Sequence, residues 1–134
     1  MIVSIKKLIE TTAATETKAR QLAGTGTDEP TWARYLEETR RQQKLWQYVH
    51  YLVSGANVEC HEGRGRKETG ASRLDLLQSL AEAEWEKAKL CRDICGRLDG
   101  AAKQAASQVV RQALQYSREF WAMAQDELIR QTAD

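Results

Sequence analysis

The sequence predicts an all-α protein, folded as an up-down-up-down antiparallel four-helix bundle with a longer loop between the second and third helices. Its 134 residues include a single proline, so helix-breaking residues are almost absent. Apolar residues recur every three or four positions instead of alternating, which is the periodicity of a helix with one buried face. Loop-like segments leave four stretches of about 20 to 30 residues, as in a four-helix bundle. We therefore expect residues 1–134 to form a single helical-bundle domain.

Glycine-containing segments bound the first two helices. The first helix is expected from about Val3 to Ala23, where the segment Gly24 to Gly26 ends it. The second begins soon afterwards, because Pro30 fits only within a first helical turn, and its pattern stops at Ser54 and Gly55. The apolar stripes are Ile5, Leu8, Ile9, Ala19 and Leu22 in the first helix and Trp32, Tyr35, Leu36, Trp46, Val49 and Val53 in the second.

The segment from Ala56 to Ala71 is interpreted as a solvated connection. It contains adjacent Cys60 and His61 and a Gly-Arg-Gly-Arg-Lys run, but that run lacks the preceding strand and the Gly-Lys-Ser/Thr ending of a phosphate-binding loop. A zinc site shared with Cys91 and Cys95 would have to bridge most of the bundle's length. Both of these cysteines are therefore interpreted as small packing residues.

The last two helices follow from a capping signal and a glycine-rich turn. Ser72 with Asp75 three residues later is a capping pair that opens the third helix. A tight turn over Gly96 to Gly100 is expected to end it, since one uninterrupted helix through this region would be unusually long. The fourth helix is expected from about Ala101 to Thr132.

The middle of the expected bundle is unusually polar. Inward carboxylates in a four-helix bundle are how di-iron proteins of the ferritin-like class hold metal, yet this chain has no Glu-x-x-His motif. Glu84 also precedes Lys87 by three residues, and this pair is interpreted as support for the outer face of the third helix. Whether the glutamates face inward stays open. The candidate ligand-binding residues are Glu16, Glu38, Gln42, Glu84 and Tyr116.

The end of the second helix is apolar or aromatic around most of its circumference. One core-facing stripe cannot bury every member of the segment WQYVHYLV at 46–53, so at least one aromatic side chain must face outward. Tyr48 is the expected outward anchor, because it lies off the stripe that contains Trp46 and Val49. In the up-down-up-down arrangement Trp121 reaches the same end. The candidate interface residues are Trp46, Tyr48, Tyr51, Leu52 and Trp121.

Composition and charge restrict the possible functions. Twenty basic and nineteen acidic residues give a net charge of +1, so no general attraction to nucleic acid or to an anionic membrane is expected. The chain has no apolar run long enough for a signal peptide or a membrane span, and its three cysteines, an odd number, favour reduced thiols. We therefore expect a cytoplasmic protein.

The leading functional hypothesis is a non-enzymatic, adaptor-like assembly protein that acts as a homo-oligomer, with a dimer favoured, or that binds another protein. No catalytic dyad or triad can be assigned from the sequence, and we expect no cofactor and no bound metal. The alternative, from a different class, is a bundle that binds a metal ion or a small ligand through its polar middle.

Overall fold

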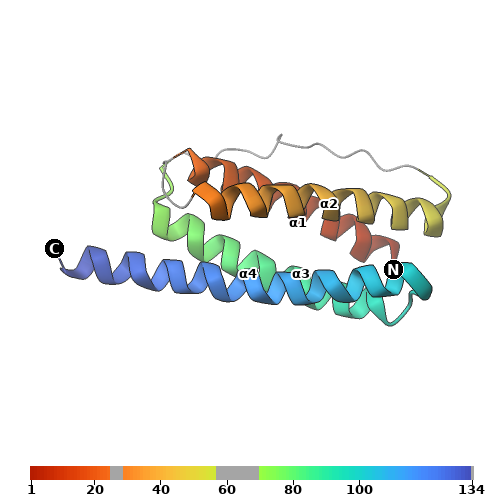
Figure 1. The fold of residues 1–134 in the computed structure, drawn as a ribbon. Coiled ribbons are helices and arrows are strands. Elements are labelled where there is room, and N and C mark those ends of the chain that lie inside the picture. The colour runs from red at the N-terminus through yellow and green to blue at the C-terminus, as the bar shows by residue number, and fades with distance from the viewer. Residues whose placement is uncertain (25–28, 57–69, 134) are drawn as a thin grey trace.

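The structure, a computed structural model, describes residues 1–24, 29–56 and 70–133 and consists of four helices (Figure 1). They are α1 (Ile2–Ala23), α2 (Glu29–Ser54), α3 (Arg73–Cys95) and α4 (Gly100–Ala133). Within these ranges there is no β-strand, so the all-α class and the four-helix bundle are confirmed. Among the described helices, none is both long enough and apolar enough to cross a membrane.

The direction of α3 differs from the expected up-down-up-down arrangement. The start of α1 and the end of α2 share one core cluster with the end of α3 and the start of α4. Consequently α3 runs parallel to α2, so the end of α2 at Ser54 and the start of α3 at Arg73 lie at opposite ends of the bundle (Figure 1). Each helix still packs antiparallel to its neighbours, because α2 and α3 lie on one diagonal of the bundle and α1 and α4 on the other.

Local signals set the helix ends. The Ser72 hydroxyl accepts a hydrogen bond from the backbone N–H of Asp75 at 3.1 Å, as the capping pair predicts. The α2 helix stops at Gly55, whose φ of 74° lies in the left-handed region and whose N–H donates to the Tyr51 carbonyl. The expected turn between α3 and α4 is also confirmed, since α3 ends at Cys95.

Two apolar clusters form the core, one toward each end of the bundle. Trp32 and Tyr35 pack against Phe120 and Tyr116 in the first cluster, with the Trp32 and Phe120 rings stacked at 5.4 Å. Trp46 lies in the second, which gathers residues of all four helices. Buried polar side chains lie among them. We call this set the buried polar layer: Thr12, Thr15, Glu16, Thr39, Gln42, Gln43, Glu84 and Lys87.

The four helices do not approach one another equally. Along α3 and α4 the buried residues Ala81, Ala88, Ala106 and Ala113 are small, and the Ser117 hydroxyl donates to the Ala81 carbonyl at 2.9 Å. Small side chains allow close packing, and these two helices share the most extensive contact. In contrast, the backbones of α2 and α4 approach each other least among the neighbouring pairs, and large side chains such as Trp32 and Phe120 lie between them. The seam between these two helices is therefore the widest in the bundle.

Candidate functional site

A fully buried ion pair lies at the centre of the buried polar layer. The Lys87 ammonium is 2.7 Å from Glu84 Oε1, and neither side chain is exposed to solvent. Lys87 also donates to Gln42 Oε1 at 3.1 Å, and the Tyr35 hydroxyl donates to Glu84. Burying a charge is costly unless it is paired and hydrogen-bonded, and each of these charges has two such partners.

Tyr35 stays protonated in this environment. Burial raises the pKa of its hydroxyl well above 10, and the neighbouring Glu84 carboxylate raises it further. The phenol therefore donates to Glu84 across the whole physiological pH range. Lys87 Nζ also lies 5.8 Å from the centre of the Tyr35 ring, which places the cation against an aromatic face.

Two other members of the buried polar layer, Gln43 and Glu16, make contacts that involve α1. Gln43 Nε2 donates to the Ile9 carbonyl at 3.0 Å, which links α2 to α1. Glu16 Oε1 accepts from the Arg20 guanidinium at 2.6 Å, so its charge is paired along α1 itself. Glu16 Oε2 has no hydrogen-bond partner among the described residues. Glu16 is thus buried, but its ion pair is separate from that of Glu84.

A second polar network links α2 to α4 closer to the surface. The Tyr116 hydroxyl donates to Glu38 and accepts from Arg34 Nε at 3.2 Å. Arg34 also forms an ion pair with Glu119 at 2.9 Å and lies over the Tyr116 ring. Burial and the hydrogen bond to Glu38 raise the pKa of Tyr116, so this hydroxyl also stays protonated.

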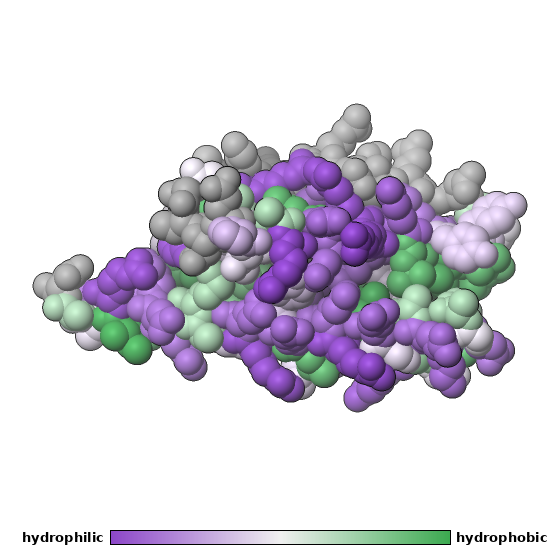
Figure 2. Space-filling view, in the orientation of Figure 1, coloured by the Kyte–Doolittle hydropathy of each residue, from purple (hydrophilic) through white to green (hydrophobic). Residues whose placement is uncertain are grey.

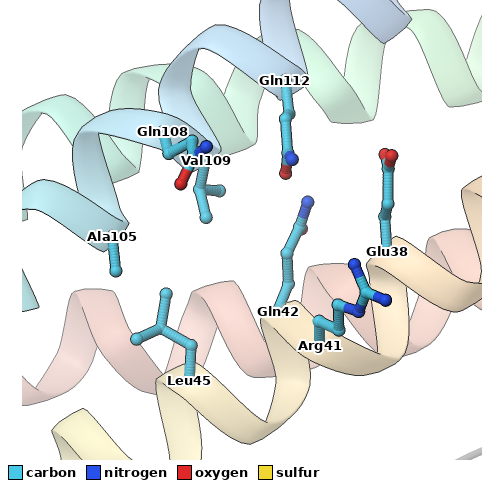
Figure 3. A pocket seen from close by; sticks show the side chains of 8 residues that line it. All are labelled: Glu38, Arg41, Gln42, Leu45, Ala105, Gln108, Val109 and Gln112. Atoms are coloured by element: carbon cyan, nitrogen blue, oxygen red, sulfur yellow. The ribbon is translucent and has the colours of Figure 1, made fainter.

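Next to this network the wide α2–α4 seam opens into a groove of about 310 Å³ (Figure 3). Gln42 and Gln112 project toward each other across it from opposite helices. The lining positions are spaced at three, four and seven residues on each helix, so one face of each helix forms a wall. We call this feature the α2–α4 groove, and its lining residues are Glu38, Arg41, Gln42, Leu45, Ala105, Gln108, Val109 and Gln112.

The structure separates the five candidate ligand-binding residues into three groups. Glu84 and Gln42 meet through Lys87, Glu38 meets Tyr116, and Glu16 pairs along α1. In the described part of the chain, no three His, Cys, Asp or Glu residues come together as metal ligands. Cys60 and His61, which are adjacent in the sequence, lie outside the described residues.

Sequence reasoning missed the central role of Lys87. The pair it forms with Glu84 exists, but it is buried and does not support an outer face. A signal was available, because Lys87 lies seven residues after the buried Leu80 and three after Glu84, on the inward side of the helix. Because a lysine side chain is charged, Lys87 was expected to face solvent in spite of this spacing.

The aromatic end of α2 is partly exposed. Tyr48, Tyr51 and Leu52 are each at least half exposed, and Val53 is partly so. We call these four residues the α2 patch; the space-filling view shows hydrophobic side chains gathered at the right-hand end of the molecule, where α2 finishes (Figure 2). Trp46, expected at an interface, is instead fully buried in the core.

Trp121 does not join the α2 patch. Its side chain is exposed, but it follows Phe120 of the opposite core cluster, so the parallel course of α2 and α3 places it toward the other end of the bundle. This separation corrects the expectation that Trp121 and Tyr48 share one end. Instead of Trp121, the start of α1 lies beside the end of α2, and Ile2 and Val3 are exposed there.

Comparison with protein families, with curated proteins and with solved structures found no match to the chain.

Proposed function

We propose that the protein is a non-enzymatic helical interaction module that associates with a second copy of itself through the α2 patch. The observation that carries the proposal is the exposure of Tyr48, Tyr51 and Leu52 together on one end of one helix. Clustered exposed apolar side chains mark protein interaction sites, and tyrosine is among the residues enriched at the energetic centres of interfaces.

The charge of this segment favours a second copy as the partner. Residues 45–56, LWQYVHYLVSGA, contain no Asp, Glu, Lys or Arg. In a two-fold symmetric interface each patch meets an identical patch, so a charge near the symmetry axis would face its own copy. An uncharged patch avoids this repulsion, and Tyr hydroxyls at its surface can exchange hydrogen bonds across the symmetry axis.

The geometry of the α2 end also suits a rigid contact surface. The helix is closed by Gly55, and the His50 ring nitrogen Nδ1 lies 3.0 Å from the Ala56 carbonyl, so His50 anchors the turn that follows the helix. His50 itself is buried beneath the patch. Side chains on a fixed helix lose less conformational freedom on association than side chains on a loop.

The test is the oligomeric state of a charge-introducing variant and of a matched control. Wild-type protein is expected to sediment as a dimer at tens of micromolar, whereas Tyr48→Glu should be monomeric with an unchanged far-ultraviolet circular dichroism spectrum. Because truncation of a central interface aromatic commonly costs about 2 kcal/mol, we expect the Kd to rise at least about thirtyfold. The control is Trp85→Glu, since Trp85 is a similarly exposed aromatic (51%, against 59% for Tyr48) in the middle of α3.

Trp85→Glu should leave the dimer intact. A monomeric wild-type protein at this concentration would contradict the proposal, as would a Tyr48→Glu variant that stays dimeric. Equal dissociation by both variants would show that association does not depend on the α2 patch.

A further inference from the structure

We propose that the α2–α4 groove binds a small uncharged nitrogen heterocycle whose edge carries an N–H donor beside a hydrogen-bond acceptor, as a purine base with an amino group does. The groove shares no residue with the α2 patch, so this inference is independent of self-association. Its volume of about 310 Å³ is at the lower end of the range of small-molecule sites.

The floor of the groove supplies a hydrogen-bond donor. A lysine ammonium can only donate, so the Gln42 atom that faces Lys87 at 3.1 Å has to be the amide oxygen. The Gln42 amide nitrogen is then directed away from Lys87, and within the described chain it has no hydrogen-bond acceptor. Figure 3 shows the end of this side chain directed into the gap, toward Gln112. Because Gln42 is buried and held by Lys87, its donor is fixed in place before a ligand arrives.

Glu38 supplies an acceptor at the same end of the groove. One of its carboxylate oxygens accepts from the Tyr116 hydroxyl, which Arg34 in turn holds through its own hydrogen bond. The other oxygen, Oε1, accepts no hydrogen bond from any described residue. Glu38 and Gln42 are one helical turn apart on α2, so their side chains are neighbours on one face of the helix. A ligand edge with a donor next to an acceptor complements this pair.

The opposite end of the groove suits a flat ring. Leu45 lies on α2 and faces Ala105 and Val109 on α4, and these three side chains carry no polar atom (Figure 3). An aromatic heterocycle placed here would bury one apolar face while its polar edge reached Glu38 and Gln42. The groove therefore has the division of a small-molecule site, with an apolar part and a few fixed polar groups.

The charges around the groove favour a neutral ligand. Arg41 pairs with Glu37 at 2.8 Å, and Lys87 pairs with Glu84 below the floor. A charged ligand group would be attracted by one of Glu38 and Arg41 and repelled by the other, because both line the groove. An uncharged heterocycle meets neither repulsion, so neither a phosphate nor an ammonium group is expected to add affinity here.

The experiment is a titration of ¹⁵N-labelled protein followed by amide chemical shifts. The two probes are 9-methyladenine, which has an amino donor next to a ring acceptor, and 9-methylpurine, which has the same ring without the amino group. A ligand of this size should bind with a Kd on the order of 1 mM, and the shifts should include the Gln42 side-chain amide. Since 9-methylpurine offers Glu38 no donor, it should bind at least about tenfold more weakly.

A pair of variants locates the site. Gln112→Phe places a ring in the groove and should weaken 9-methyladenine binding at least about tenfold, whereas Gln115→Phe on the outer side of α4 should leave it unchanged. The proposal is overturned if wild-type protein shows no saturable shift with 9-methyladenine at 10-fold the expected Kd, roughly 10 mM. It is equally overturned if both probes bind alike, a result that requires no variant, or if Gln112→Phe binds as the wild type does.

Discussion

Replacing Lys87 with methionine is expected to destabilise the protein strongly, because the change leaves Glu84 without its cation. Both side chains are fully buried, and the two charged groups are 2.7 Å apart. Methionine retains most of the length and hydrocarbon volume of lysine, so the lost packing is small. Removing one partner of a buried ion pair costs about 3 to 5 kcal/mol, because the remaining charge stays in a poorly solvated interior.

This loss is large compared with the stability of a whole domain, which is about 5 to 15 kcal/mol. For 134 residues the unfolding entropy near the midpoint is about 0.28 kcal/mol/K, from roughly 2.1 cal/mol/K per residue. The midpoint of thermal unfolding should therefore fall by about 11 to 18 °C. Such a shift is far outside the error of a melting experiment.

The assay is urea unfolding at pH 7 followed by circular dichroism, with Lys89→Met as the matched control. Glu86 and Lys89 repeat the spacing of the buried pair on the same helix at 2.8 Å, but their side chains are 54% and 46% exposed. Solvent screens this pair, so Lys89→Met should change the free energy of unfolding by less than about 1 kcal/mol.

A loss below about 1 kcal/mol for Lys87→Met would refute the reasoning, because it would mean that Glu84 needs no cation. A double-mutant cycle with Glu84→Leu provides a second check. The double variant removes both charges, so its loss should be smaller than the sum of the two single losses by at least about 2 kcal/mol. Simple additivity would show that the two charges do not act as a pair.

Two further predictions concern a thiol and a turn. Burial raises the pKa of the Cys91 thiol from 9.0 to about 12. As the pH rises, the unfolded chain therefore loses this proton before the folded protein does. The free energy of unfolding should then fall between pH 9 and pH 12, by about 1.4 kcal/mol per pH unit. The stability difference between wild type and Cys91→Ala, measured in urea at pH 8 and pH 10.5, should therefore shrink by about 2 kcal/mol; a difference independent of pH would contradict the buried, protonated thiol. Gly100→Ala should lower stability by about 1 to 2 kcal/mol, because Gly100 has a φ of +60° although no atom crowds the added carbon. Gly96→Ala is the control in thermal melts, because Gly96 has a right-handed φ of −65° and should tolerate the added carbon. Equal losses of stability for the two variants would contradict the left-handed conformation of Gly100.

The helix bounds could be predicted because their causes are local. Pro30 limits where α2 can begin, Ser72 caps α3, and glycines end α2 and separate α3 from α4. These signals act within one or two turns of the chain, so they can be identified without knowledge of the packing.

The direction of α3 could not be predicted in this way. A chain from Gly55 to Ser72 can extend to roughly 59 Å, whereas α3 with its 23 residues is roughly 35 Å long. The connection is therefore long enough for either direction, and only packing decides. The wrong direction in turn placed Trp121 beside the end of α2.

The arrangement of the candidate site could not be predicted. The sequence placed Glu16, Glu84 and Gln42 at the middle of the bundle and left open whether the glutamates face inward, and all three side chains are buried. The sequence could not indicate that the balancing cation would be a lysine of the same helix, because spacing places Lys87 inward while its charge suggests solvent. The α2–α4 groove depends on the distance between the backbones of two helices that large side chains hold apart, which no local pattern encodes.

The parallel course of α2 and α3 has a consequence for how the chain folds. Each of the pairs α1 with α2 and α3 with α4 is a helical hairpin between sequence neighbours, whereas the contact of α1 with α3 joins distant parts of the sequence. Local contacts form with little loop-closure entropy, so the two hairpins are expected to assemble early and nearly independently. Docking of one hairpin on the other is then expected to be the slower step, and this docking brings Lys87 of α3 to Gln42 of α2.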